Sequence, residues 1–490
     1  MIKLKDNSYL FSIILLLSSF FFIRLFLWNW ASLDLSFDEA QYFSWAQNLD
    51  WGYYSKPPML AWVIKIFTTL CGDSELCIRI ASPFLHSFTA LFIGLASYNF
   101  ASYKNKFIIL MAASIWLLIP GISLSSGFIS TDVPLLFFTS LCLWMLSLFS
   151  SENMNYKNNI YFLLLGVFLA LAFLSKYAIL YLLIGSIVAV VMDRDIRNNF
   201  FIYINFKRLC LILIFFFIII IPHILWNFEN GFITAQHTMA NANLGGEWKG
   251  ISNLIKFFVE QFFVYGFITF LILLVILFKF KTFNRNERFL IFLTLTPILI
   301  ILFQAFISRA HANWAAIAYV PGTILVTTYF MQLWDKNKKH LFYINVISGL
   351  FIMFLIPLSG VYNLGVDPYK KNRGWAELGL AISEIFYIYP DAVLVADDRR
   401  VLAEALYYMK IKPYNWVRWN ADGIIHDHYE LVTNHNDLIS KTGIMVSSEE
   451  DNIHFKSFFK DVIFIKTITR KMGNDKIKEY KVWMLKGYIK

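Results

Sequence analysis

Residues 9–28 read YLFSIILLLSSFFFIRLFLW, an apolar run whose one charged residue is Arg24. A run of about 20 apolar residues is long enough to cross the hydrocarbon core of a bilayer as a helix. It starts close to the N-terminus, as a secretion signal would, but bulky aromatic residues continue to Trp30 and no small-residue cleavage site follows. The run is therefore predicted to stay in the protein as a membrane anchor.

Further apolar stretches of similar length follow along the chain. The predicted spans cover residues 9–28, 80–100, 106–123, 131–150, 159–175, 177–192, 209–226, 256–280, 288–307, 314–333 and 341–358. A chain that is 58% hydrophobic and contains 50 Phe is not an ordinary soluble domain. The sequence predicts a polytopic α-helical membrane protein with about eleven transmembrane helices.

Basic residues in the short loops predict the orientation, because such loops are retained in the cytoplasm. If the N-terminus lies inside, the basic residues of alternate loops all fall on that side. They are Lys3, Lys5, Lys104, Lys106, Lys157, Arg194, Arg197, Lys207, Arg208, Lys279, Lys281, Arg285, Arg288, Lys336, Lys338 and Lys339. Topology then accounts for the net charge of +10 without nucleic-acid binding. If 159–175 and 177–192 formed one bent helix, every later assignment would invert.

Residues 361–490 carry more charge and shorter apolar stretches than the rest of the chain. Residues 375–387 and 400–409 are predicted to form helices, and residues 392–395 a buried strand. We expect a transmembrane domain over 1–360, whose first external loop covers about 29–79 and carries juxtamembrane helices. Residues 361–490 are expected to form an extracytoplasmic, periplasmic α/β domain.

Only four cysteines occur, and they imply neither a disulfide framework nor a zinc site. Cys142 and Cys210 lie in predicted spans and are interpreted as packing residues. Cys71 and Cys77 are both predicted to be external, where an oxidising compartment would allow a disulfide. Their spacing alone leaves that pairing open.

Polar residues from distant parts of the chain are predicted to meet on the external face. The set comprises Asp38, Glu39, Gln41, Tyr42, Lys56, Ser125, Ser126, Ser130, Asp132, Lys176, His223, Asn227, His237, Arg309, His311 and Asn313. Acids together with several cations suit a reaction in which a carboxylate deprotonates an acceptor hydroxyl while cations neutralise a leaving phosphate.

Simpler interpretations exist for the same residues. Asp38 and Glu39 could be helix N-terminal charges, and Asp132 could be a helix N-cap. The long cations could extend to lipid headgroups; these are Lys56, Lys176 and Arg309. His237 could simply be solvated, and His223 is interpreted as a packing residue.

Four motifs carry a family resemblance. They are Asp38-Glu39-Ala40-Gln41-Tyr42, Tyr54-Ser55-Lys56-Pro57-Pro58, Ser130-Thr131-Asp132-Val133-Pro134-Leu135 and Leu174-Ser175-Lys176. Up to about residue 360 the chain resembles the integral-membrane C-type (GT-C) glycosyltransferases. It is similar to bacterial relatives of the protein O-mannosyltransferases and of the enzymes that transfer aminoarabinose to lipid A. The stretches 309–314 and 397–400 and the C-terminal domain resemble bacterial family 39 glycosyltransferases.

This resemblance implies a polyprenyl-phosphate sugar donor, with Asp38 as the catalytic base and Lys56 near the lipid phosphate. Asp132 and Lys176 would line the same site. The candidate catalytic residues are thus Asp38, Glu39 and Asp132, and the candidate donor-binding residues are Tyr54, Lys56, Lys176, Arg309 and His311. Aminoarabinose transferases have an acidic residue where this chain has Ser55. That difference argues against an aminoarabinose donor and leaves a divalent metal as an open question.

The expected function is glycosyl transfer at the periplasmic face of a bacterial inner membrane, from undecaprenyl phosphate or a similar carrier. The acceptor could be lipid A, lipopolysaccharide, another envelope glycan or, as in protein O-mannosyltransferases, a protein hydroxyl. A nucleotide-sugar enzyme would need a cytoplasmic site, and the sequence shows none. A transporter or flippase for lipid-linked sugars is the alternative, although neither an inverted repeat nor midplane polar residues are evident.

Overall fold

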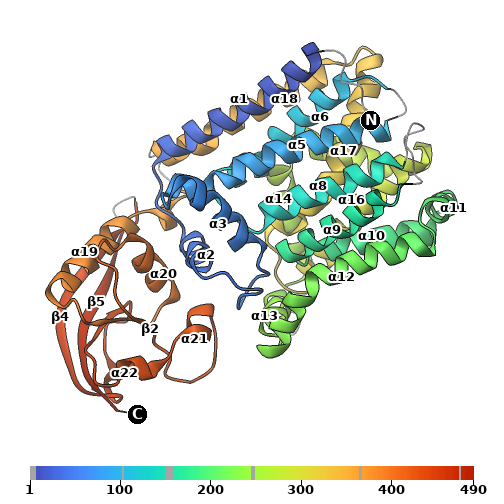
Figure 1. Cartoon of the computed structure of the whole chain (residues 1–490). Helices are drawn as coiled ribbons and strands as arrows, with labels where there is room; N and C mark the ends of the chain where they lie inside the picture. The colour runs from blue at the N-terminus through green and yellow to red at the C-terminus, as the bar shows by residue number, and fades with distance from the viewer. Residues whose placement is uncertain are drawn as a thin grey trace. The chain divides into compact units, whose positions relative to one another are not determined.

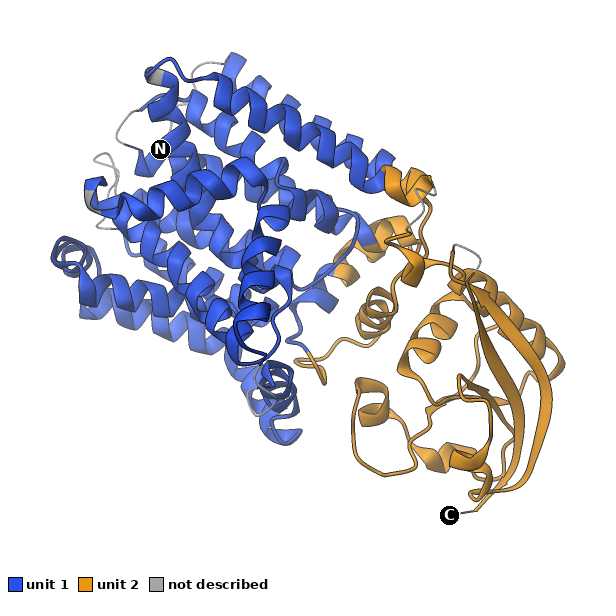
Figure 2. Ribbon diagram, turned by 180° about the vertical axis from the view of Figure 1, so that it is seen from behind, with its two compact units in different colours: residues 1–27, 56–63, 79–357 blue, residues 28–55, 64–78, 358–490 orange. Residues whose placement is uncertain are grey.

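The computed structural model describes residues 7–101, 104–149, 158–243, 249–362, 367–473 and 476–489. The chain divides into two compact units (Figure 2). The helical unit comprises residues 1–27, 56–63 and 79–357, and the second unit comprises 28–55, 64–78 and 358–490. One division falls close to the expected boundary at residue 360. The second unit, however, also includes most of the predicted first external loop.

The helical unit consists of helices, most of them apolar (Figure 1). In chain order they are α1 (Asn7–Ala31), α5 (Ala81–Phe100), α6 (Phe107–Leu117), α7 (Pro120–Ser125), α8 (Asp132–Leu148), α9 (Ile160–Ser175), α10 (Ile179–Met192), α11 (Arg194–Tyr203), α12 (Phe206–Glu229), α13 (Ile233–Ala242), α14 (Gly250–Val264), α15 (Phe267–Phe278), α16 (Arg285–Ile307), α17 (Tyr319–Asp335) and α18 (His340–Val361). Two 3-10 helices, η1 (Phe280–Thr282) and η2 (Ala312–Ala318), connect some of them. Each predicted span consists mainly of helix, although 106–123 is interrupted after Leu117 and continues as α7 from Pro120. This confirms a polytopic helical membrane protein.

By length and composition, six helices of the described chain can cross a membrane, and a bent pair adds a seventh. The pair is α14 and α15, which meet at 117° where the sequence predicted one helix over 256–280. That expectation was wrong because Gly266, between the two helices, has a φ of +94° that interrupts helical geometry. Shorter apolar helices, including α6, α8, α9 and α10, account for the other predicted spans.

Helices α9 and α10 are two antiparallel helices, as the sequence predicted. At one end, Lys176 between them bonds Asp132 at the start of α8. At the other end, Asp193 after α10 pairs with Arg288 at 2.6 Å. The ring of Phe162, near the start of α9, stacks on Phe149 at this second end. The chain therefore turns back at Lys176.

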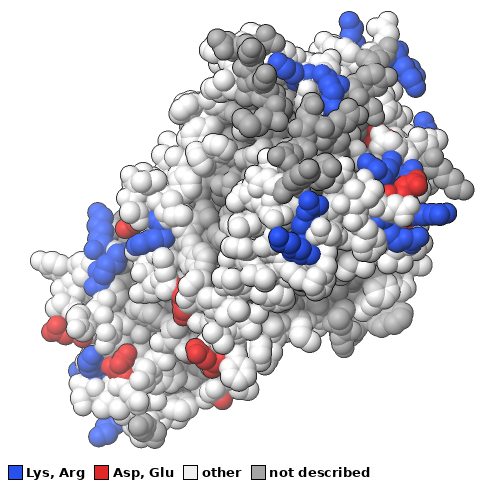
Figure 3. All heavy atoms as spheres, turned by 45° about the vertical axis from the view of Figure 1, so that its right-hand side comes forward, with Lys and Arg blue, Asp and Glu red and all other residues white. Residues whose placement is uncertain are grey.

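The basic loops lie together at the end of the helical unit that carries Phe149. A small cavity there is lined by the ends of α5 and α8, by α11 and by the start of α16. The ends of α17 and α6 meet through the rings of Phe107 and Trp334, 5.1 Å apart. Figure 3 shows Lys and Arg side chains crowded at the upper right of the molecule. Lys3, Lys5 and Lys157, which the orientation argument also used, lie outside the described residues.

Small residues allow close helix packing in this unit. A side chain at Gly166 of α9 would collide with the carbonyl oxygen of Ile212 in α12. Gly94 of α5 also lies close against Ile109 of α6. Such contacts are typical of membrane helices, whose association depends on close packing of their backbones.

A five-stranded sheet organises the C-terminal part of the second unit. Its strands are β1 (Val393–Ala396), β2 (Trp416–Arg418), β3 (Gly443–Ser447), β4 (Phe459–Lys471) and β5 (Ile477–Tyr488), in the order β2-β1-β3-β5-β4. β1 is parallel to β2 and β3, and the β3–β5 and β4–β5 pairs are antiparallel. The accompanying helices are α19 (Trp375–Ile388), α20 (Arg399–Tyr408), α21 (His428–Val432) and α22 (Ile453–Lys456). The predicted helices and strand are confirmed.

Part of the predicted first external loop packs on this α/β structure. Helix α2 (Phe37–Gln47) lies against α20. The loop between α3 (Met59–Cys71) and α4 (Glu75–Arg79) is closed by a Cys71–Cys77 disulfide. Tyr407 of α20 donates a hydrogen bond to the carbonyl oxygen of Asp73 in that loop at 2.8 Å. The disulfide left open by the sequence is thus formed, while Cys142 is buried and Cys210 half-buried, both with free thiols.

Candidate active site

Asp132 is the centre of a polar cluster in the helical unit. One carboxylate oxygen accepts a hydrogen bond from Lys176 Nζ at 2.7 Å, and the other accepts one from Asn313 Nδ2 at 2.8 Å. Asp132 is the first residue of α8 and its side chain is 12% exposed. Its carboxylate therefore connects the start of α8 to two other segments, the turn after α9 that carries Lys176 and the segment before α17 that carries Asn313. The N-cap interpretation is wrong, because Thr131 holds that position.

Two further candidates lie near this cluster. The guanidinium of Arg309 donates to Oδ1 of Asn241 at 3.1 Å. The His311 ring packs edge-on against Trp314, with ring centres 5.2 Å apart. Partial burial lowers the pKa of His311, and the positive charges of Arg309 and Lys176 lower it further, against a smaller opposing effect of Glu260. The imidazole is therefore neutral at pH 7, close to two cations.

His223 of α12 is buried with its polar atoms bonded. Its Nε2 lies 2.7 Å from the hydroxyl of Tyr177, and the amide of Asn227 contacts the same ring. The interpretation of His223 as a packing residue is confirmed.

In the second unit, the acidic pair begins α2. The side chain of Ser36 accepts from the backbone N–H of Glu39, and the Glu39 carboxylate accepts from the backbone N–H of Ser36 at 2.9 Å. This capping box stabilises the start of the helix and accounts for the burial of Glu39. Asp38, by contrast, has a side chain that is 49% exposed. Of the pair, Asp38 is the carboxylate that a substrate can reach.

The segment that ends in Tyr54 is held by the C-terminal part of the same unit. The hydroxyl of Tyr54 donates to the carbonyl oxygen of Ile425 at 3.3 Å, and its backbone N–H donates to Nδ1 of His428 at 3.5 Å. Tyr53 stacks on Trp45 at 4.4 Å, and His428 packs edge-on against both rings. Burial lowers the pKa of His428 to about 4, so this ring is neutral and can accept a hydrogen bond.

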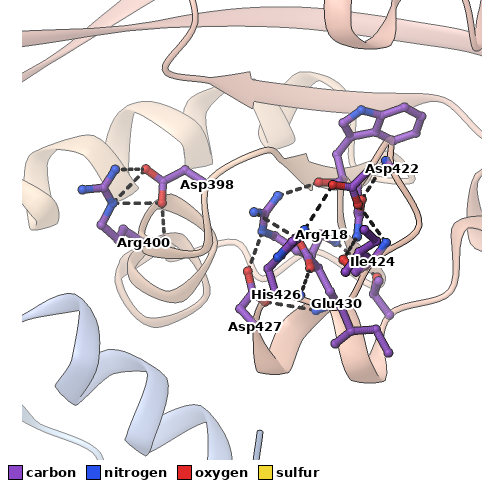
Figure 4. Close-up of polar contacts among 12 residues, drawn as sticks. Asp398, Arg400, Arg418, Asp422, Ile424, His426, Asp427 and Glu430 are labelled. Carbon is purple, nitrogen blue, oxygen red and sulfur yellow. Dashed lines mark hydrogen bonds and ion pairs between the residues drawn. The ribbon is translucent and has the colours of Figure 1, made fainter. Parts of the chain in front are cut away.

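Ion pairs and hydrogen bonds stabilise the loop that carries Ile425 and His428 (Figure 4). Arg418 donates through Nε to Asp427 at 2.9 Å, and its Nη2 lies 3.2 Å from Glu430. Asp427 in turn caps α21 by accepting from the backbone N–H of Glu430 at 3.1 Å. The sequence analysis missed this network, whose only local signal was the density of charges between residues 418 and 430.

The structure thus groups the predicted site residues into two sets. Asp132, Lys176, Arg309 and His311 belong to one polar region of the helical unit, whereas Asp38, Glu39 and Tyr54 belong to the second unit. Lys56 is half-buried in the helical unit. Asn313 belonged to the predicted polar set but was not assigned a role, Arg399 was noted only within the stretch 397–400, and His428 was missed. Within the described ranges, no three His, Cys, Asp or Glu side chains lie close enough together to hold a metal ion.

Apolar membrane helices, an exposed carboxylate at the start of α2 and a largely buried acid–lysine pair fit an integral-membrane glycosyltransferase of the GT-C class. Residues 55–226 match the family described as dolichyl-phosphate-mannose-protein mannosyltransferase. The chain is 30% identical to lipid A galacturonosyltransferase RgtD of Rhizobium johnstonii over 427 residues, 85% of this chain and 86% of the relative. It is 24% identical to lipopolysaccharide core galacturonosyltransferase RgtA of the same organism over 56% of this chain and 52% of the relative.

The fold agrees with this sequence relationship. The structure of ArnT from Cupriavidus metallidurans in the apo state superposes with a TM-score of 0.67 at 12% identity, over 98% of both chains. The structure of the same protein bound to undecaprenyl phosphate gives a TM-score of 0.65. The chain belongs to the glycosyltransferase family that includes RgtD. It is a multi-pass membrane enzyme.

Proposed function

We propose that this protein transfers a uronosyl sugar from a polyprenyl phosphate to lipid A or the lipopolysaccharide core. The observation that carries the proposal is the 30% identity to a lipid A galacturonosyltransferase over 85% of the chain. The reaction takes place at the periplasmic face of the inner membrane, where the donor is embedded in the bilayer.

In this reaction Asp38 accepts the proton of the attacking acceptor hydroxyl. The hydroxyl oxygen forms a new bond to the anomeric carbon while the bond from that carbon to the phosphate oxygen breaks, and polyprenyl phosphate leaves. Lys56, Lys176 and Arg309 stabilise the negative charge of the phosphate as it develops. His311, neutral at pH 7, serves as a hydrogen-bond donor to the same oxygens.

Asp132 has a supporting role in this proposal. Both of its carboxylate oxygens already accept hydrogen bonds, from Lys176 and Asn313, so it is poorly placed to take up a proton. A carboxylate paired in this way holds the ammonium group of Lys176 in one position. Glu39 supports Asp38 through the capping box of α2.

The proposed activity is tested by mass spectrometry of lipid A and core oligosaccharide from cells with and without the gene. A uronosyl substituent that disappears on deletion and returns with the plasmid-borne gene supports it. A sugar that is lost only from envelope proteins would instead establish a protein acceptor.

Donor binding gives a prediction for Lys56 and Arg309. Charge-assisted contacts to a phosphate are worth about 1.5–3 kcal/mol each, so Lys56→Ala and Arg309→Ala should each weaken donor binding about tenfold or more. Binding of the polyprenyl-phosphate donor to purified protein measures this. Lys338→Ala, in the exposed turn before α18, is the control and should bind normally. Unchanged affinity in both variants would remove them from the phosphate site and leave Lys176 as the next candidate.

Topology gives a second prediction, because the periplasmic assignment depends on it. In a Cys210→Ser background, Tyr414→Cys should react with a membrane-impermeant thiol reagent in cells whose outer membrane has been permeabilised. Lys338→Cys should react only after the inner membrane is opened. Tyr414 is 88% exposed and Lys338 is exposed, so accessibility of the residue itself is not limiting. The reverse pattern would place the basic loops outside and contradict the periplasmic site.

A further inference from the structure

Arg399 connects the C-terminal α/β structure to the proposed catalytic base. It is the first residue of α20, and its Nη1 donates to Oε1 of Gln41 at 2.6 Å and lies 3.5 Å from Oδ1 of Asp38. The guanidinium also lies over the ring of Phe37, 5.1 Å from its centre. All three partners come from the first turns of α2, so the position of this cation is defined by the helix that carries Asp38.

The contacts of Arg399 leave one edge of the guanidinium open. Both polar contacts use Nη1, and among the described residues no group accepts a hydrogen bond from Nε or Nη2. The Arg399 side chain is 36% exposed. An edge with two parallel N–H donors matches the two oxygens of a carboxylate.

This open edge distinguishes Arg399 from the other arginines of the second unit. In Arg400, Nε and Nη2 both bond Asp398 (Figure 4), and in Arg418 the same atoms contact Asp427 and Glu430. In Arg373 and Arg470 these atoms are likewise bonded, to Asp367 and to backbone carbonyl oxygens. Structural arginines in this unit thus use the edge that Arg399 leaves available.

We propose that Arg399 binds the carboxylate of the uronic acid that is transferred; this inference rests on the proposed function. The sugar must lie beside Asp38 when the acceptor hydroxyl attacks, and the carboxylate of a uronic acid is part of that same ring. A second carboxylate close to Asp38 would be repelled by it unless a cation lay between them. Arg399 contacts Asp38, and the N–H groups of its open edge can donate to the second carboxylate.

The test compares two donors that share the carrier phosphate and differ only at the sugar carboxylate. One is polyprenyl-phosphate galacturonic acid, and the other is polyprenyl-phosphate galactose. Arg399→Gln should lower kcat/KM for the uronosyl donor about 10- to 100-fold more than for the neutral donor. Arg399→Lys should recover part of that difference, and Arg400→Gln should behave like the unsubstituted enzyme with both donors.

The outcomes separate this inference from the proposed function. Equal losses with both donors would mean that Arg399 acts on the phosphate or on the fold, and would overturn its role in binding the sugar carboxylate. Preference of the unsubstituted enzyme for the neutral donor would also overturn the inference, while leaving polyprenyl-phosphate-dependent transfer intact. Absence of transfer from any polyprenyl-phosphate sugar would overturn the proposed function itself.

Discussion

Asp38→Asn should abolish nearly all sugar transfer while leaving expression and donor binding intact. The amide keeps the shape of the side chain but cannot accept the proton of the acceptor hydroxyl. Loss of a general base typically lowers kcat about 10² to 10⁴-fold. Because the Asp38 side chain is half exposed and does not take part in the capping box, α2 should keep its structure. Single-turnover transfer by purified protein with saturating donor measures the effect.

A matched control separates this loss from a general effect of removing a negative charge. Asp461, an exposed carboxylate on β4, offers the comparison: Asp461→Asn should transfer sugar at the normal rate.

Glu39→Gln should lower the stability of α2, since its carboxylate completes the capping box. Wild-type turnover by the purified Asp38→Asn variant would eliminate Asp38 as the base.

Arg418→Ala should strongly destabilise the second unit. The side chains of its partners Asp427 and Glu430 are only 8% and 3% exposed, so the substitution leaves two buried carboxylates without a cation. Breaking a buried ion pair from one side costs about 3–5 kcal/mol. Thermal unfolding in detergent should show the loss, and transfer activity should fall with it, because the loop bearing His428 also holds Tyr54.

Arg400→Ala is the internal control for this prediction. The Arg400 side chain is 49% exposed, and its partner Asp398 also accepts a hydrogen bond from the backbone N–H of Arg400, so a smaller loss than in Arg418→Ala is expected. The response to pH gives a second check. Burial raises the pKa of Glu430 already in the intact network, so without Arg418 the folded state should favour the protonated carboxyl still more. The stability lost in Arg418→Ala should therefore shrink as the pH is lowered towards 5. Equal unfolding temperatures for the two variants would show that the loop does not depend on Arg418.

Local features of the sequence were enough to predict the helices and the class of enzyme. Each span is a continuous apolar run, and the helices and strand of residues 375–409 follow short periodic patterns. These properties depend on neighbours within a few residues, so they can be read without knowing the fold. The motifs around Asp38, Lys56, Asp132 and Lys176 likewise lie in short stretches of sequence.

Tertiary structure decided the contacts between these stretches. The bend at Gly266 depends on a backbone conformation that hydropathy does not record. The contact between Arg399 and Asp38 joins residues 361 positions apart, and Tyr54 and His428 are 374 apart. Such pairings arise when α2 packs on α20, and only then does one arginine keep an open edge while its neighbour Arg400 is bonded to Asp398. A hydropathy pattern shows which faces are buried, but the side chains that meet across those faces depend on how distant segments pack together.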